Sequence, residues 1–195
     1  MTATAPTKKY VLSGERFSLP AVILLTLVAL LAGWLLKTGV ENRSQAFQSG
    51  GISAQIPVGW LNQTRTGSEV LHITERSAAG FGTTYIIQQE PISADNGAEQ
   101  FLGMLTLERG TSLVSYKVLR QQDVLVLGRQ AAEIEYVYVE SDPNTAHATL
   151  PAVVHGLDYV FIQGNSAIIV TYRADASAYN ADAGRFYLFL QSVNY

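Results

Sequence analysis

The sequence contains no cysteine. Its absence excludes disulfide bonds, thiolate nucleophiles, zinc fingers and iron–sulfur clusters held by this chain. Because eukaryotic secreted domains of this size often carry disulfides, the composition favours a bacterial protein. Charged residues are also scarce, at 15%, while hydrophobic residues make up 48%. The body of the chain is therefore predicted to fold around a core rather than to be disordered.

The motifs of common enzyme classes are missing as well. There is no Gly-x-Ser-x-Gly elbow, and neither Ser115 nor Ser166 falls in a predicted strand-to-helix turn. The Ala-Gly-Phe-Gly stretch at 79–82 lacks the lysine and the following helix of a phosphate-binding loop. We therefore expect no catalysis and no cofactor.

The net charge of −3 is unevenly distributed. Residues 1–49 carry five basic and two acidic side chains, whereas residues 50–195 carry eight basic and fourteen acidic ones. An acidic domain repels phosphate backbones, so we expect no nucleic-acid partner.

One long hydrophobic run, at residues 19–36, contains eighteen residues without a charge and is followed by Lys37. A helix of that length spans about 27 Å, close to the hydrocarbon core of a bilayer. The run ends in Gly-Trp-Leu-Leu-Lys rather than in a small-x-small cleavage site. A retained anchor is therefore favoured over a cleavable signal peptide.

These features predict four segments: a cytoplasmic tail at 1–18, a transmembrane helix at 19–37, a polar linker at 38–51 and an extracytoplasmic domain at 52–195. Lys8, Lys9 and Arg16 precede the helix and place the N-terminus in the cytoplasm by the positive-inside rule. Lys37 and Arg43 on the other side weaken this bias.

Small residues within the run suggest a contact with another membrane helix. Ala29 and Gly33 have small-xxx-small spacing, which lets two helices approach closely, although ordinary anchor composition explains them too. Trp34 suits the outer interface. The predicted anchor and packing residues are Leu19, Ala29, Gly33, Trp34 and Leu36.

Downstream, β-rich segments between breakers predict strands, and two stretches with a 3.6-residue period predict helices. The strands are expected at 52–56, 70–74, 83–89, 112–121, 123–127, 129–139, 152–163 and 167–173. The helices are expected from 98 to about 110, capped by Ser93 or Asp95, and at 178–191. Gly164-Asn165 predicts a hairpin turn, and 141–144 a second turn. This order predicts an α+β fold in which two helices cover a curved antiparallel sheet.

The order of elements resembles the PsbP-like family, which includes the photosystem II extrinsic subunit of that name and DcrB-type lipoproteins. The resemblance rests on the Pro57-x-Gly59-Trp60 turn after the first strand, a helix at 98–108, a strand pair around Gly128 and an aromatic-rich final helix. It covers about residues 50–195. It implies a mostly non-enzymatic domain that binds or assists larger assemblies. No metal-ligand motif of that family is recognisable.

Candidate metal ligands are few. The chain has three histidines, at positions 72, 147 and 155, without HxH or HxxxH spacing, so we interpret them as structural. Glu133 and Glu135 share a strand face, with further carboxylates at 140 and 142. Because the spacing of a calcium loop is missing, a solvated acidic face is the better interpretation. No metal is expected.

Four of the ten tyrosines lie on predicted strands and are candidates for contacts with a partner: Tyr136, Tyr138, Tyr159 and Tyr172. Exposed tyrosine favours protein interfaces. The alternative is that their rings pack under the helices with hydroxyls at the rim.

The sequence favours a non-catalytic, single-pass accessory subunit of a larger bacterial membrane complex of photosynthetic or respiratory type. Its expected partners are integral membrane subunits and the bilayer of the cell membrane. The alternative is a stand-alone membrane-anchored domain that binds a small ligand or lipid. The first predicts that side chains fill the space between sheet and helices, and the second predicts an open apolar cavity there.

Overall fold

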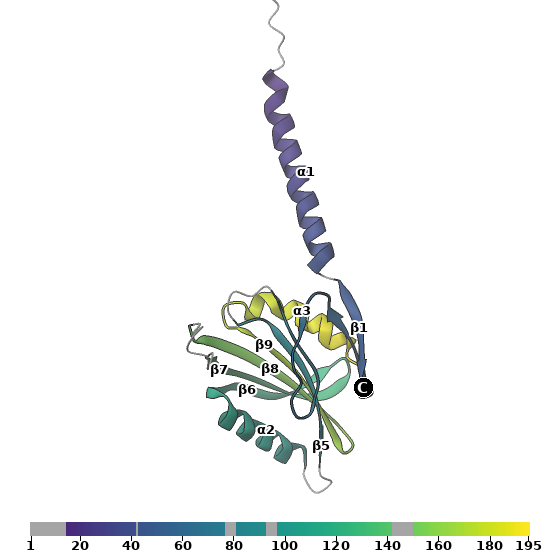
Figure 1. Cartoon of the computed structure of the whole chain (residues 1–195), viewed down its shortest axis with the longest axis vertical. Helices are drawn as coiled ribbons and strands as arrows, with labels where there is room; N and C mark the ends of the chain where they lie inside the picture. Colours follow the sequence, from purple (N-terminus) through teal and green to yellow (C-terminus); the bar gives the residue numbers. More distant parts are fainter. Residues whose placement is uncertain (1–14, 42, 77–80, 93–96, 142–149) are drawn as a thin grey trace, which may run out of the picture. The chain divides into compact units, whose positions relative to one another are not determined.

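The computed structural model describes residues 15–41, 43–76, 81–92, 97–141 and 150–195, and in the first helix only the side chains at 20–36 and 39 (Figure 1). The chain divides into two compact units, Met1–Arg43 and Ser44–Tyr195.

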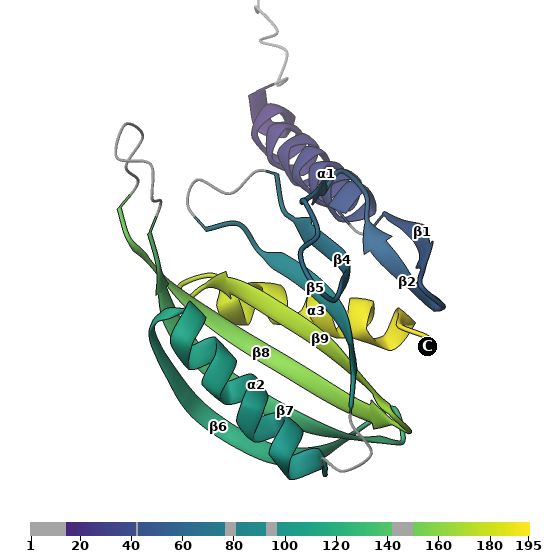
Figure 2. The same cartoon turned by 60° about the horizontal axis from the view of Figure 1, so that its bottom comes forward.

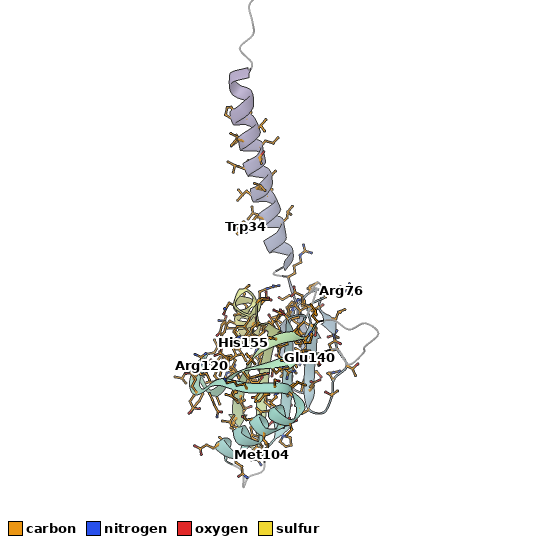
Figure 3. All side chains as sticks on the ribbon, turned by 90° about the vertical axis from the view of Figure 1, so that its left-hand side faces the viewer. Trp34, Arg76, Met104, Arg120, Glu140 and His155 are labelled. Atoms are coloured by element: carbon orange, nitrogen blue, oxygen red, sulfur yellow. The ribbon has the colours of Figure 1, made fainter. Side chains whose placement is uncertain are left out.

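The first unit contains one helix, α1, Glu15–Glu41, which is longer at both ends than the predicted 19–37. Pro20 therefore lies in its second turn rather than its first. The large apolar side chains described in α1 are exposed, from 53% for Ile23 to 71% for Leu36, and project from it on all sides (Figure 3). Within the described part of the chain, no helix has the length and apolarity required to cross a membrane.

The predicted linker at 38–51 is wrong. Residues Ser44–Ser49 form strand β1, which pairs in antiparallel register with β2, Ile52–Pro57. Gly50 and Gly51 make the turn between them with φ of 58° and 79°, a conformation that glycine adopts without strain. Phe47 is the only large apolar residue of β1, so the strand lacks the alternation by which strands are recognised.

The second unit also contains a seven-stranded antiparallel sheet with strand order β3-β4-β5-β9-β8-β7-β6 (Figure 2). Its strands are β3 Leu61–Asn62, β4 Glu69–Thr74, β5 Thr84–Pro91, β6 Val114–Val126, β7 Arg129–Glu140, β8 Ala152–Gln163 and β9 Ser166–Asp175. The helices are α2, Ala98–Ser112, and α3, Tyr179–Ser192. The predicted α+β fold with an antiparallel sheet is confirmed.

Local details depart from the predictions in two places. The segments 112–121 and 123–127 form one edge strand, β6, whose pairing with β7 is irregular at two points. The N-cap of α2 is Gly97, without a side-chain cap, whereas the predicted caps Ser93 and Asp95 lie outside the described residues. Most of the predicted turn at 141–144 also lies outside them.

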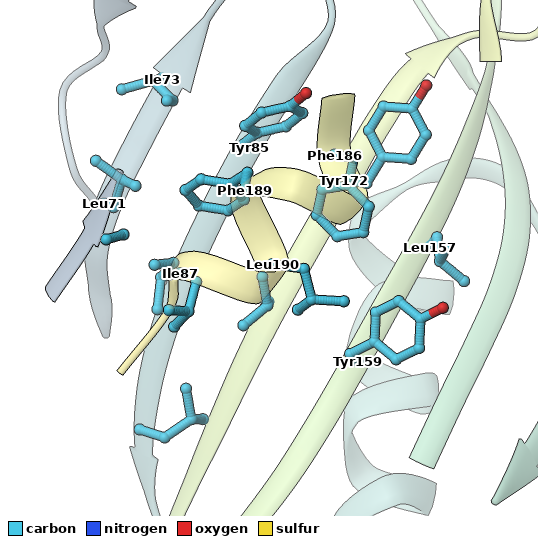
Figure 4. Packing of buried hydrophobic residues seen from close by; sticks show 14 of the residues in the cluster. Leu71, Ile73, Tyr85, Ile87, Leu157, Tyr159, Tyr172, Phe186, Phe189 and Leu190 are labelled. Atoms are coloured by element: carbon cyan, nitrogen blue, oxygen red, sulfur yellow. The ribbon is translucent and has the colours of Figure 1, made fainter. Parts of the chain in front are cut away.

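The two shorter helices cover opposite faces of the sheet, so the domain has two cores (Figure 2). On the α3 face, the ring of Tyr85 stacks on Phe189 at 4.7 Å and that of Tyr172 on Phe186 at 4.9 Å (Figure 4). Trp60 packs against Tyr85 at 4.6 Å, after the turn in which Gly59 has φ of 87°. Aromatic rings therefore fill the space between sheet and helix.

On the α2 face, three buried residues of the helix, Phe101, Leu102 and Leu105, share a core cluster with Tyr136 and Tyr138 of β7. Gly156 of β8 is paired with Tyr136 across the sheet. A Cβ added at Gly156 would lie 2.3 Å from two ring carbons of Tyr136, so the buried ring occupies the space that any larger residue needs.

Replacing Gly156 with alanine should destabilise the domain by about 2 kcal/mol or more, because Tyr136 is fully buried and has no room to move. Urea unfolding of the full chain in a non-ionic detergent, followed by circular dichroism, measures this. Gly184→Ala is the matched control, since an added Cβ in α3 meets nothing within 4 Å. It should stabilise by up to about 1 kcal/mol. Equal urea midpoints for Gly156→Ala and the wild type would contradict the packing described.

Candidate functional site

Next to α2, part of the sheet face remains open as a groove of about 470 Å³. Its lining comes from β4, β5, β7 and β9 and from the segments before β4 and β5. The lining residues used below are Gln63, His72, Thr74, Thr84, Tyr138 and Arg173. We call this feature the Arg173 groove. It adjoins the core under α2, since Tyr138 belongs to both.

Arg173 of β9 is held by the two tyrosines of β7. Its Nε donates to the hydroxyl of Tyr136 at 3.2 Å, and its guanidinium carbon lies 5.7 Å from the ring centre of Tyr138. Burial lowers the pKa of Arg173, but Tyr136, Tyr138 and Asp158 outweigh this effect and raise it above its ordinary value. Among the described residues, no carboxylate forms an ion pair with Arg173.

Behind Arg173 lies the carboxylate of Asp158 in β8, which is 1% exposed. Its Oδ1 accepts hydrogen bonds from Thr171 at 2.7 Å and from the hydroxyl of Tyr136 at 3.3 Å. Burial raises the pKa of Tyr136 more than Arg173 lowers it, so the hydroxyl keeps the proton that it donates. Tyr136 thus connects Arg173 to Asp158 in one chain of hydrogen bonds.

A second guanidinium reaches Asp158 from α2. Nη2 of Arg109 lies 3.4 Å from Oδ2 of Asp158 and donates to Gln88 at 3.0 Å. The contact is an ion pair by distance but not a hydrogen bond, since Oδ2 of Asp158 has no hydrogen-bond partner among the described residues. The Nε of Arg109 also lacks one. We call Arg109, Asp158 and Arg173 the charge cluster. It holds two positive charges and one negative charge.

The opposite face of the sheet carries the two carboxylates interpreted above as a solvated acidic face, and that interpretation is wrong. Glu133 is only 6% exposed. Arg120 bridges it to Glu135 with distances of 2.9 and 3.0 Å. Tyr159 donates to Glu133 at 2.9 Å, and Nε2 of His155 lies 2.9 Å from Glu135. These oxygens are engaged by cations and donors of the chain itself.

The histidines are placed separately. Nδ1 of His72 lies 3.1 Å from Glu69, the imidazole of His155 stacks on Tyr179 at 3.6 Å, and His147 lies outside the described residues. No group of three or more His, Asp or Glu side chains in the described part of the chain is arranged to hold a metal ion.

The four tyrosines predicted to face a partner are buried: Tyr136 and Tyr172 are 0% exposed, Tyr138 2% and Tyr159 3%. Two lie in the core under α2 and two in the core under α3, which fits the alternative that they pack under the helices. Their rings are not available to a partner. Among the described tyrosines, the exposed one is instead Tyr187, at 45%.

The predicted anchor residues all lie in α1, although the side chain of Leu19 is outside the described part. Trp34 and Leu36 are 60% and 71% exposed. At Gly33 an added Cβ would meet nothing within 4 Å. The Arg173 groove was not predicted, because Arg109, Asp158 and Arg173 are far apart in sequence and form no motif.

No protein-family model and no curated protein matches the chain. The solution structure of cyanobacterial PsbP (CyanoP) from Synechocystis sp. PCC 6803 superposes with a TM-score of 0.55 at 12% identity, covering 77% of this chain and 91% of that one. The crystal structure of PA94, a protein of unknown function from Pseudomonas aeruginosa, superposes with a TM-score of 0.51 at 10% identity, covering 79% and 98%. At such identities the likeness shows the fold alone. The PsbP-like fold expected from the sequence is confirmed.

Proposed function

We propose that the chain is a non-catalytic, single-pass membrane protein that serves as an accessory subunit of a larger bacterial membrane complex. The observation that carries the proposal is the exposed apolar surface of α1. Eleven large apolar side chains are exposed along it: Val22, Ile23, Leu24, Leu25, Leu27, Val28, Leu30, Leu31, Trp34, Leu35 and Leu36.

Such a surface is unfavourable in water. Leaving one large apolar side chain exposed forgoes roughly 1.5–3 kcal/mol relative to burying it. Lipid or the apolar helices of a partner would bury the whole set. The helix has 27 residues and, at about 1.5 Å per residue, is roughly 40 Å long. The proposal assigns the uncharged run of the sequence at residues 19–36 to the hydrocarbon core.

The charge distribution supports one orientation. Basic residues precede the apolar run, which favours a cytoplasmic N-terminus, and the acidic domain then lies on the extracytoplasmic side. The aromatic core under the middle of α3 supports the accessory role, because the competing hypothesis requires an apolar cavity between helix and sheet. A pocket of about 310 Å³ does lie beside α3, where Tyr187 and Leu190 face β6, but Glu133 and Gln191 make its lining partly polar. The photosynthetic or respiratory type of complex follows only from the resemblance of the sequence to the PsbP-like family.

The second candidate function is a stand-alone anchored domain that binds a small ligand. The Arg173 groove favours it, since open pockets of this volume commonly hold small molecules. Its lining is partly polar and charged, which suits a polar ligand better than a lipid chain.

Two arginines in the middle of α1, Leu27→Arg with Leu30→Arg, should remove the protein from the membrane, because each costs about 2.5–3.5 kcal/mol at the centre of a bilayer. The measurement is the fraction of C-terminally tagged chain that remains with bacterial membranes after an alkaline carbonate wash. The matched control places the same charges on exposed leucines of the domain, Leu125→Arg with Leu188→Arg. The control should stay in the membrane. If the wild type itself washes off, the anchor proposal fails.

Affinity purification through a C-terminal tag, from the native host in mild detergent, should recover integral membrane subunits. Gly33→Leu should reduce this recovery severalfold without changing the melting of the domain, because a Cβ added at Gly33 meets no described residue within 4 Å. Leu31→Phe, about 200° around the helix from Gly33, is the control and should recover the partner normally. If the wild type recovers no membrane subunit, the accessory role is refuted.

A further inference from the structure

We propose that the Arg173 groove is a binding site for a small oxyanion, that is, for a carboxylate or phosphate group. This inference does not depend on the membrane proposal. Neither the fold likeness nor the resemblance of the sequence assigns such a site.

The first argument is the imbalance of the charge cluster. Asp158 is the only carboxylate paired with a guanidinium of this cluster among the described residues, and its contacts are with Arg109, Tyr136 and Thr171. It reaches Arg173 only through the hydroxyl of Tyr136. Buried charges are normally neutralised by partners, so one positive charge at the groove lacks a full counter-charge.

The second argument is the geometry of Arg173. Its Nε is engaged by Tyr136, which fixes the plane of the guanidinium. The terminal amino groups also approach the hydroxyl of Tyr138, and their remaining N–H groups can form charge-assisted hydrogen bonds to the oxygens of a carboxylate or phosphate. Because the site belongs to β9 in the middle of the sheet, the arginine is held by rigid strands on both sides.

The third argument is the lining. The hydroxyl of Thr84 donates to the carbonyl of Gly82 at 2.9 Å. It lies 3.1 Å from the hydroxyl of Thr74. Because the proton of Thr84 goes to Gly82, Thr74 is the donor in the threonine pair. The two threonines line the groove with His72 and Tyr138, and none of the four brings a carboxylate to it. Glu140 is the exception, but it is exposed, so its charge is screened by solvent. Its charge opposes an incoming anion, so we expect weak binding with a Kd of about 1 mM, roughly 4 kcal/mol.

The test is isothermal titration of the full chain in a non-ionic detergent, at constant ionic strength, with inorganic phosphate and separately with acetate. We expect saturable binding of at least one anion with one site per chain. The anion that binds more tightly then identifies the preferred group. Arg173→Gln should lower the affinity at least about tenfold, and Arg173→Lys should lower it less, since it keeps the charge but loses the paired donors.

Arg173→Gln removes a buried contact and could also unfold the domain, so a second variant avoids the core. Gln63 is exposed at the groove, and Gln63→Glu adds a carboxylate of the same shape there. This change should weaken anion binding roughly fivefold. Gln130→Glu, an exposed change on β7 that alters the net charge equally, should have no effect. The proposal is overturned if the wild type binds neither anion. It is also overturned if Gln63→Glu and Gln130→Glu have the same affinity for the anion that the wild type binds.

Discussion

The α2 side of the domain depends on the contacts of one buried carboxylate, that of Asp158. It lies on β8 in the middle of the sheet and accepts hydrogen bonds from Thr171 of β9 and Tyr136 of β7, so it connects three neighbouring strands. It also faces Arg109 and thereby joins α2 to the sheet. A buried charge without such partners would be strongly destabilising. The position of α2 therefore depends on Asp158 in strand β8, because Arg109 of the helix pairs with it.

The same carboxylate explains why the two faces of the sheet differ. The α3 face carries a core of aromatic rings, and its carboxylates Glu133 and Glu135 are paired with Arg120 of the edge strand β6 and His155 of β8. On the α2 face Asp158 pairs directly with Arg109 and reaches Arg173 only through the hydroxyl of Tyr136, and Arg173 lies at an open groove. The domain thus has an aromatic core on one face of its sheet and an arginine at an open groove on the other.

Much of the fold could be predicted from the sequence, because the relevant signals are local. Alternating residues in β7, the Gly164-Asn165 turn and the apolar stripe of α3 were sufficient to place these elements. The pattern does not predict β1, because polar residues dominate that strand. It predicts two strands in place of β6, because an edge strand tolerates the polar residues Gln121-Gln122-Asp123 at its middle. The site could not be predicted in the same way. Arg109, Asp158 and Arg173 meet only after the sheet has formed, and whether a strand tyrosine is exposed depends on where α2 and α3 pack.

The measurement that tests this account most directly is the stability and phosphate affinity of Asp158→Asn, with the exposed Asp123→Asn as the control for net charge. Removing the shared carboxylate should destabilise the domain by about 3 kcal/mol, because Arg109 loses its buried counter-charge. In the fraction that stays folded, phosphate should bind roughly tenfold more tightly, because the negative charge of Asp158 no longer offsets the positive charge of Arg173. Unchanged stability together with unchanged or weaker phosphate binding would contradict the account.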